Sequence, residues 1–491
     1  TIRERIDGLI DPDSFRERGL LAGIGEYDGR GQLTGFYPSG YVMGQGEIDG
    51  RRVVVGGGDY TARPPSGSSG VRTGGGRARG KGGEDERMAL ELKLPMIRLI
   101  DGFGADIRAT ASMGRTYIPE LPGWPTASAL MSEVPVISAA LGAVAGLPAA
   151  QVAICHFAIM IKETSQVFAA GPPVVERGVG RMPTKEELGG HRIHARESGL
   201  VDNEAEDEAD AFRQIRQFLS YLPTSVYKLP PVEPVDDDDP IDRREQALLS
   251  LIPRERNRPY DVREMIDLIV DRGSAFEMGR YYGAGQVTMF ARIGGRPAGI
   301  LANDPMRMGG TMDADGSQKL EKFVDLCDTF HLPVINFVDQ PGFMIGVAAE
   351  SAGTLKQGAR ALCAIDAATV PWATVIVRKM YGVAGGGHQP FNRFVFRVAW
   401  PSAEWGSIPI EGGVTAAYRR EIEDADDPAA KREEIEARMI SLRSPWAAAE
   451  AFNAEEIIDP RDTRPVLDDW LEMAYDRLPA DIGRKTRPMR P

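Results

Sequence analysis

Residues 95–104 read PMIRLIDGFG, and a second version of this stretch, PVINFVDQPG, stands at 333–342. Each is a run of β-branched and other apolar residues that ends at an aspartate, with a glycine close behind. Such a run predicts a buried strand followed by a tight turn. Because the two versions lie almost half the chain apart, they indicate that one structural unit occurs twice.

Two further pairs of segments support this duplication. IDGRRVVVGGGD at 48–59 resembles IGGRPAGILAND at 293–304, and VPVISAALGAVAG at 134–146 resembles VPWATVIVRKMYG at 370–382. The three pairs keep one order, and their spacing changes mainly at a Gly- and Arg-rich loop at 65–83. Chance similarity between apolar strands is a minor alternative, because it does not predict a shared order.

The duplication predicts an N-terminal domain at 1–235 and a C-terminal domain at 236–491. The seam is VEPVDDDDP at 232–240, a proline-flanked acidic run typical of a solvated linker. Asp236 to Asp239 are not predicted to bind a metal, because consecutive carboxylates do not converge on one ion without a turn.

Strands and helices alternate within each half. Helices are expected at 88–94, 319–330 and 353–368, because their apolar residues recur with helical spacing. This alternation predicts an α/β fold with helices on both faces of each sheet. The C-terminal region adds helices such as 429–442, which are expected to contact a neighbouring subunit.

Composition limits the function. The chain of 491 residues is 42% hydrophobic and 26% charged, which is ordinary for a globular protein. Its net charge of −13 argues against binding to nucleic acid. The three cysteines form no CxxC pair, which excludes a zinc ribbon and disfavours a disulfide framework. A cytoplasmic location is therefore expected, and the charged, amphipathic N-terminal segment is unlike a signal peptide.

Residues 134–161 carry no formal charge and are numerous enough to cross a bilayer. Pro135, Gly146 and His156 interrupt the stretch. It is therefore predicted to form two buried strands around a Gly/Ala-rich loop and a short helix, and no membrane association is expected.

The candidate chemistry lies in glycine-rich turns. Four of them, at 101–105, 142–146, 339–343 and 381–387, follow predicted buried strands, and the chain has no HExxH, GxSxG or P-loop lysine motif. Backbone N–H groups of such turns, with a helix N-terminus behind them, stabilise a developing oxyanion without a titratable side chain. A glycine at one such turn is usually only geometry, but its recurrence in both halves is a stronger indication.

Seven segments spread along the chain form a specific pattern. They are TIRERIDGLIDPDSF at 1–15, SQVFAAGPPVV at 165–175, EELGGHRIHARESGLVDNEAEDE at 186–208, NRPYDVREMIDLIVD at 257–271, ANDPMRMGGTMDADGSQKLEKFVDLCDTFHLPVINFVDQPGFMIG at 302–346, AWPSAEWGSIPIEGG at 399–413 and IIDPRDTR at 457–464. In these segments the chain resembles the carboxyltransferase β subunits of biotin-dependent acyl-CoA carboxylases, such as propionyl-CoA carboxylase.

The resemblance implies a tandem duplication of crotonase-like β-β-α superhelix domains. It implies transfer of a carboxyl group from biotin to the α-carbon, or a vinylogous carbon, of an acyl-CoA, with biotin thought to take the α-proton. This chain has no biotin-attachment sequence, so the biotin is expected on a biotin carboxylase and biotin carboxyl carrier α subunit. The family assembles as a homohexamer, a trimer of dimers, in which each site joins the first half of one subunit to the second half of another.

The family's two oxyanion turns map onto this sequence residue by residue. Phe103 and Gly104 match the turn for the acyl oxygen, and Val383 and Ala384 match the turn for the ureido oxygen of biotin. In each turn one family glycine is replaced, by Phe103 and by Val383. Both replacements keep a backbone N–H, but neither residue takes a positive φ easily.

Residues expected to bind substrate surround these turns. Gly386 stands where some relatives carry an aspartate that tunes acyl choice, so we expect room for an acyl group larger than acetyl or propionyl. Arg77 and Arg79 belong to the 65–83 loop, which either binds the phosphates of CoA or is simply solvated. The predicted substrate-binding set is Gly142, Ala145, Gly146, Gly386, Arg77, Arg79 and Lys81, with no metal ligand.

Two other residues are expected to be structural: His194, because the reaction needs no protein base, and Cys155, which lies in an apolar run.

Alternatives to the carboxylase remain. A crotonase-type hydratase or isomerase would need Glu side chains near the turns, and none was found. A catalytically silent scaffold paralogue is suggested by the replaced glycines. A biotin-dependent acyl-CoA decarboxylase would run the transfer in reverse.

Overall fold

The computed structural model describes all residues except 60–80, 104–113, 117, 119 and 488. The chain divides into two compact units. The first comprises 1–229 and 482–491, and the second comprises 230–481. The division falls a few residues before the predicted boundary between 235 and 236. The C-terminal tail belongs to the first unit, where the Gly483 N–H donates to the Val226 carbonyl at 2.8 Å.

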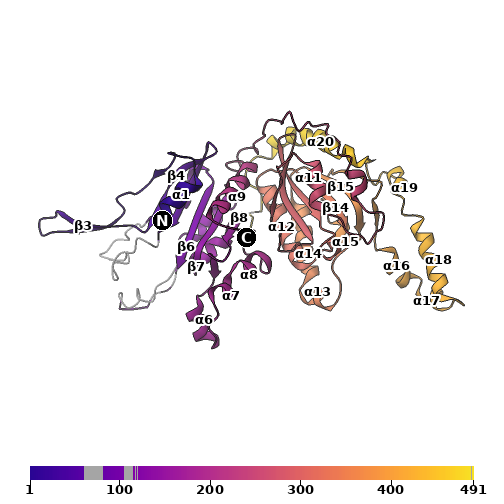
Figure 1. Ribbon diagram of the computed structural model, residues 1–491, viewed down its shortest axis with the longest axis horizontal. Coiled ribbons are helices and arrows are strands. Elements are labelled where there is room, and N and C mark those ends of the chain that lie inside the picture. Colours follow the sequence, from indigo (N-terminus) through magenta and orange to yellow (C-terminus); the bar gives the residue numbers. More distant parts are fainter. Residues whose placement is uncertain (60–80, 104–113, 117, 119, 488) are drawn as a thin grey trace. The chain divides into compact units, whose positions relative to one another are not determined.

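The first unit is built on an eight-stranded sheet in the order β1-β4-β5-β6-β7-β8-β10, with β9 also paired to β7 (Figure 1). The pairs β1–β4 and β4–β5 are antiparallel, and all later pairs are parallel. The strands are β1 (Arg16–Glu17), β4 (Tyr41–Ile48), β5 (Arg51–Gly58), β6 (Met96–Phe103), β7 (Val136–Ala145), β8 (Phe157–Ile161), β9 (Gln166–Phe168) and β10 (Asn203–Ala205).

The second unit repeats this topology strand for strand. Its sheet has the order β11-β12-β13-β14-β15-β16-β18, with β17 paired to β15. The first two pairs are again antiparallel and the rest parallel. The strands are β11 (Phe276–Met278), β12 (Gln286–Ile293), β13 (Arg296–Asn303), β14 (Val334–Gln340), β15 (Trp372–Tyr381), β16 (Phe396–Ala399), β17 (Glu404–Gly406) and β18 (Glu456–Ile457). The predicted duplicated α/β fold is confirmed.

Helices precede, connect and follow the strands in both units. Those of the first unit are α1 (Ile2–Leu9), α2 (Glu84–Leu92), α4 (Trp124–Leu130), α5 (Leu147–Ala153), α6 (Pro172–Val179), α7 (Lys185–Gly189), α8 (His191–Arg196) and α9 (Glu208–Tyr221). Those of the second are α10 (Leu248–Leu251), α11 (Val262–Ile269), α12 (Ala314–Thr329), α13 (Val347–Ser351), α14 (Thr354–Ala367), α15 (Gly382–Gly386), α16 (Ile410–Ala417), α17 (Arg419–Glu423), α18 (Pro428–Ile440), α19 (Pro445–Glu450) and α20 (Thr463–Arg477).

The core of the second unit shows how alternation in the strands makes two layers. Val287, Met289 and Ala291 of β12 all pack into one apolar cluster, together with residues of α11 and α20. Phe290 lies between them on the opposite face, where the centre of its ring is 5.1 Å from that of Phe323 of α12. Successive strand residues point to opposite faces, so α11 and α20 cover one face and α12 the other.

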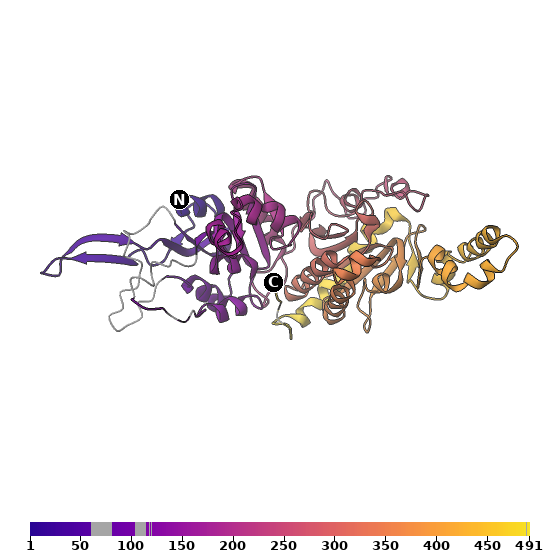
Figure 2. The ribbon, with the colours of Figure 1, turned by 90° about the horizontal axis from the view of Figure 1, so that it is seen from below.

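Two segments project from their own unit (Figure 2). In the first unit this is the antiparallel hairpin of β2 (Gly23–Tyr27) and β3 (Leu33–Pro38). In the second unit it is α16 to α18, which share a small cluster of Val414, Ile422 and Ile435. The predicted helix at 429–442 is therefore present as α18.

The uncharged stretch 134–161 forms β7, α5 and β8, as predicted. Among the described residues, no helix is both long and apolar enough to span a membrane. The predicted start of the turn at residue 142 is wrong, because β7 continues through Ala145. The strand is extended by its parallel pairing with β9, in which Ala143 lies opposite Gln166.

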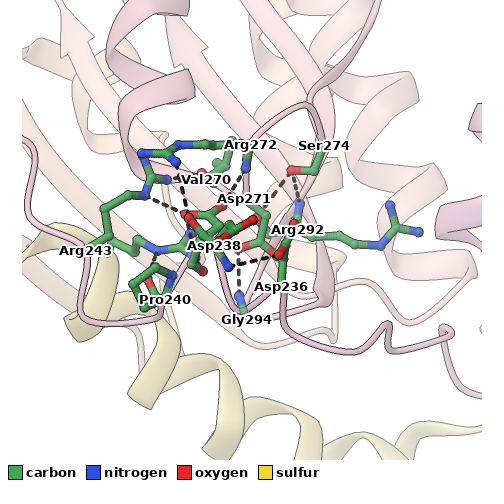
Figure 3. A network of polar contacts seen from close by, with 12 residues as sticks. Asp236, Asp238, Pro240, Arg243, Val270, Asp271, Arg272, Ser274, Arg292 and Gly294 are labelled. Carbon is green, nitrogen blue, oxygen red and sulfur yellow. Dashed lines mark hydrogen bonds and ion pairs between the residues drawn. The ribbon is translucent and has the colours of Figure 1, made fainter.

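The acidic seam is not a simple solvated linker, which corrects the prediction for Asp239. This side chain is 5% exposed, and its carboxylate pairs with the guanidinium of Arg243 at 2.7 Å. Figure 3 shows Arg243 and Arg272 beside Asp238 of this run. Asp239 also accepts the Arg272 backbone N–H at 2.7 Å and lies 3.6 Å from Arg464. Buried charges are stable only when paired, so the run anchors the start of the second unit.

Candidate functional site

An aspartate ends the straight part of β6, just before the first predicted oxyanion turn. Asp101 accepts from the Arg5 guanidinium at 3.1 Å, and Arg5 also donates to the Leu141 carbonyl of β7 at 3.2 Å. A Cβ on Gly142 would lie 2.3 Å from the Asp101 carboxylate. Glycine at 142 therefore makes room for the carboxylate that links α1 to the ends of both strands.

The second unit has the same arrangement with a different partner. Asp339 is the penultimate residue of β14 and is held by Arg378 of β15, with a nitrogen–oxygen distance of 2.8 Å and almost no solvent exposure. In the sequence repeat, Arg378 stands at the position of Gly142. The strand pairing is irregular at both aspartates, between Ile100 and Gly102 and again between Val338 and Gln340. Each unit thus carries a bulged strand end fixed by an Asp–Arg pair.

The first predicted oxyanion turn follows this bulge. Phe103 is the last residue of β6, is 49% exposed, and lies opposite Ala145 in the register of β6 and β7. Gly146 then takes a φ of 72° and directly precedes α5. The structure therefore brings Phe103, Ala145 and Gly146 together at one edge of the sheet, whereas Gly104 lies outside the described residues.

The second predicted oxyanion turn lies at the start of the short helix α15. Gly382 takes a φ of 63° after β15, Val383 is 66% exposed, and Ala384 is buried. The first N–H groups of a helix have no acceptor within the helix. Nothing lies within 4 Å of a Cβ built on Gly386, so this position faces open space.

Sequence reasoning missed the residue that anchors α15. His388 directly follows the glycine-rich turn and is 2% exposed. Its carbonyl accepts from Asn336 Nδ2 at 2.8 Å and from Trp372 Nε1 at 3.0 Å. Its ring contacts Asn336 at 2.8 Å and Gln340 at 3.3 Å, and burial lowers its pKa to about 4. A neutral histidine therefore joins α15 to β14, and only the glycines beside it gave a signal.

Only the C-terminal end of the predicted basic loop at 65–83 lies among the described residues. Arg77 and Arg79 lie outside the described residues. The Lys81 ammonium is nearly buried and contacts the Glu17 carboxylate at 3.3 Å and the Tyr41 carbonyl at 3.1 Å. Lys81 therefore fixes the C-terminal end of the loop to the sheet.

Both residues expected to be structural have contacts or burial within the first unit. His194 contacts the Val167 carbonyl at 2.5 Å and the Ser198 hydroxyl at 3.0 Å, and burial lowers its pKa. Cys155 is fully buried. Within the described part of the chain, no group of three or more His, Cys, Asp or Glu side chains could hold a metal ion.

The first unit also contains a cavity of about 470 Å³ that the sequence did not predict. It lies between β5, β6 and the start of α5, and the carboxylates of Asp85 and Glu86 line it. Of the carboxylates that line it, sequence reasoning singled out only Asp101, because Asp85 and Glu86 precede the predicted helix. The cavity is lined by Tyr41, Gly56, Gly57, Gly58, Gly82, Gly83, Asp85, Glu86, Arg98, Leu99, Ile100, Asp101, Leu121, Pro122, Gly123, Trp124, Ala127, Leu147, Pro148 and Gln151.

Two crotonase-like halves in one chain, each ending a bulged strand in a glycine-rich turn, define a carboxyltransferase fold. The family model described as the carboxyl transferase domain matches residues 1–489. The chain belongs to this family, which confirms the resemblance.

Individual relatives agree with this assignment. The chain is 35% identical to a propionyl-CoA carboxylase beta chain of Cereibacter sphaeroides, over 94% of this chain and 88% of the relative. It is 34% identical to a methylmalonyl-CoA decarboxylase subunit alpha of Veillonella parvula, over 79% and 74%. The crystal structure of transcarboxylase 12S, a hexamer with methylmalonyl-CoA and methylmalonic acid bound, matches with a TM-score of 0.82 at 32% identity, over 99% and 90%.

Proposed function

We propose that this chain is the carboxyltransferase component of a biotin-dependent acyl-CoA carboxylase. It moves a carboxyl group from biotin on a partner subunit to the α-carbon, or a vinylogous carbon, of an acyl-CoA. The observation that supports this most directly is the repeated strand end, in which an Asp–Arg pair fixes a glycine-rich turn in each unit. Two fixed sets of main-chain amides suit a reaction with two transient oxyanions.

Each turn has its own role in the proposal. The N–H groups of Phe103 and Gly104 bind the thioester oxygen, and those of Val383 and Ala384 bind the ureido oxygen of biotin. The exposed start of α15 fits an anionic oxygen, because the helix N-terminus carries partial positive charge. Bound biotin supplies the carboxyl group and the base, so the chain's residues need only orient the reactants and stabilise charge.

Substrate binding follows from the residues around the turns. Gly142, Ala145 and Gly146 shape the acyl side, and Arg77 and Arg79 bind the CoA phosphates. Gly386 leaves space for an acyl group larger than propionyl, which is consistent with the open space at its Cβ position. Kinetics over a series of acyl-CoA esters test this point, and a strict preference for acetyl-CoA would contradict it.

The proposal includes partners: a biotin carboxylase and biotin carboxyl carrier α subunit, and five further copies of this chain in a hexamer. A hexamer is supported by the assembly of transcarboxylase 12S. Transfer in the decarboxylating direction is a second candidate, favoured by the similarity to a methylmalonyl-CoA decarboxylase subunit.

Two measurements test the function. In cell extract, streptavidin should capture this chain through a biotinylated α subunit. The purified chain should carboxylate free biotin from malonyl-CoA or methylmalonyl-CoA, and the Val383→Pro variant, which lacks one N–H of the second turn, should lose most of this activity. No transfer by the folded wild-type chain would support the silent scaffold instead. Activity with a captured partner that hydrolyses no ATP would favour the decarboxylase.

A further inference from the structure

The cavity of the first unit has mostly apolar walls and a polar end. Leu99, Ile100, Leu121, Trp124 and Leu147 provide the apolar surface. The polar end is formed where β4, β5 and the start of α2 meet. A volume of about 470 Å³ lies in the range of small-molecule sites, in which a few polar groups among apolar walls set specificity.

Tyr41 and Asp85 form the centre of the polar end. The Tyr41 hydroxyl lies 2.5 Å from an Asp85 carboxylate oxygen, and the other oxygen accepts the Glu86 N–H at 3.0 Å. A Cβ on Gly56 would lie 2.0 Å from the Asp85 carboxylate and 2.7 Å from the Tyr41 hydroxyl. The pair therefore occupies the space directly over the glycine backbone of β5.

The arginines near the cavity are already engaged. Arg98 is paired with Glu86 at 2.8 Å and donates to the Ile154 carbonyl at 2.7 Å, and Arg5 is paired with Asp101. No cationic side chain among the described lining residues other than Arg98 faces the cavity. A carboxylate on the ligand would therefore meet Asp85, Glu86 and Asp101 with no unpaired cation to offset them.

The Tyr41–Asp85 contact can exist in two protonation states. If Asp85 is ionised, the Tyr41 hydroxyl donates to it, and a tyrosine lone pair remains for a ligand donor. If Asp85 is protonated, as desolvation that raises its pKa favours, it donates to Tyr41, and the tyrosine O–H can turn to a ligand acceptor. A ligand hydroxyl pairs with Tyr41 in both states, whereas an ammonium only donates and an alkyl group does neither.

We propose that this cavity binds the acyl chain of a CoA thioester that bears a neutral hydroxyl group, and that Tyr41, positioned by Asp85, selects that hydroxyl. This inference rests on the proposed function and places the acyl chain in a cavity lined by Asp101 and Leu147, which stand next to the residues proposed for the acyl side. Tyr41 is the specificity-determining residue, and Asp85 is a positioning residue that acts through it.

Binding of matched four-carbon thioesters to the full chain tests the proposal. Dissociation constants are measured by titration calorimetry for butyryl-CoA, 3-hydroxybutyryl-CoA, 4-hydroxybutyryl-CoA, 3-aminobutyryl-CoA and succinyl-CoA. We expect one of the hydroxy esters to bind about tenfold more tightly than butyryl-CoA, as one well-formed hydrogen bond provides. We expect the amino and succinyl esters to bind more weakly than the hydroxy ester.

The Tyr41→Phe variant should abolish this preference and leave the affinity for butyryl-CoA within about twofold. Tyr37→Phe is the matched control, because Tyr37 lies in the β2–β3 hairpin and does not line the cavity. Asp85→Asn should reduce the preference without reversing it. The measurements on the wild-type chain stand even if a variant fails to fold.

Each other outcome overturns the inference in a distinct way. Equal binding of butyryl-CoA and both hydroxy esters removes the hydroxyl specificity but leaves the proposed carboxyltransferase intact. An equal loss for all esters in Tyr41→Phe places Tyr41 against the CoA arm that they share. Tightest binding of the amino or succinyl ester would show a charged ligand class. Failure to bind any CoA thioester would contradict the proposed function as well.

Discussion

Asp339 and Arg378 form a buried ion pair directly beneath the turn at the end of β14. Three contacts fix it: the Arg378 guanidinium lies 4.9 Å from the centre of the Tyr260 ring, the Lys379 N–H donates to Asp339 at 3.1 Å, and the Asp339 N–H donates to Asn303. Removing one partner of such a pair leaves a buried charge without compensation. We therefore expect Asp339→Ala to lower the free energy of unfolding by about 3–5 kcal/mol, as measured by urea denaturation.

A surface pair of the same unit provides the control for this prediction. Arg360 and Glu321 lie 2.9 Å apart, but Arg360 is 56% exposed. Because water screens this pair, Arg360→Met should change the free energy of unfolding by less than about 1 kcal/mol. Equal effects of Asp339→Ala and Arg360→Met would show that Asp339 does not stabilise the unit through its charge.

His388 makes the stability of the second unit depend on pH. Its pKa is lowered to about 4 by burial, and a histidine in an unfolded chain titrates near 6.5. Between these values the unfolded chain binds more protons than the folded chain, so stability is lost as the pH falls from about 6.5 to 4. The slope from one such group is at most about 1.4 kcal/mol per pH unit.

Urea denaturation of the wild-type chain and a His388→Met variant across pH 4.5–7.5 measures this contribution. Carboxylates also titrate in this range, so the quantity of interest is the difference between the two proteins. We expect the difference in stability to change with pH only below about 6.5, and to level off above it. A constant difference throughout would show that His388 is not held neutral by the fold.

Gly142 of β7 leaves the space that the Asp101 side chain of β6 occupies. A methyl group there would lie 2.3 Å from the Asp101 carboxylate and force Asp101 away from Arg5. We expect Gly142→Ala to cost about 1–3 kcal/mol in the free energy of unfolding of the first unit and to weaken acyl-CoA binding. Gly386→Ala is the matched control for stability, since its Cβ position is open, and thermal denaturation compares the two.

The elements of the fold were predicted well because their signals are local. The run 96–101 and its copy at 334–339 became β6 and β14, and the common order of the repeats became two sheets of the same topology. The sequence analysis ended β7 too early, because its last residues are held by pairing with β9, and no local sequence pattern indicates this pairing. Asp239 was assigned to solvent because its partners Arg243 and Arg464 come together only in the folded unit.

Only the part of the candidate site that lies in continuous segments was predicted from the sequence. Family motifs identify Phe103 and Val383, because the turns are continuous segments. The contacts of His388 with Asn336 and Gln340, and the cavity shared by Tyr41 and Asp85, join residues from separate strands and helices. Such groupings depend on strand order and register, which one sequence does not specify beyond its repeats.

The proposed hexamer leads to a prediction that does not follow from either unit alone. In the proposed hexamer, each site takes the first half of one subunit and the second half of another. Phe103→Pro removes an N–H from the first turn only, and Val383→Pro removes one from the second turn only. Homogeneous oligomers of either variant should therefore be nearly inactive in transferring a carboxyl group to free biotin.

Co-expression of the two variants separates the possible arrangements. If sites form between subunits, half of the randomly assembled pairs are mixed, and each mixed pair contains one site with both turns intact. The mixture should then recover about a quarter of the wild-type activity. If each site lay within one subunit, every site would contain an altered turn and no activity would return. Equal subunit incorporation, checked by mass spectrometry of the intact oligomer, is required for this comparison, because only random pairing yields that fraction.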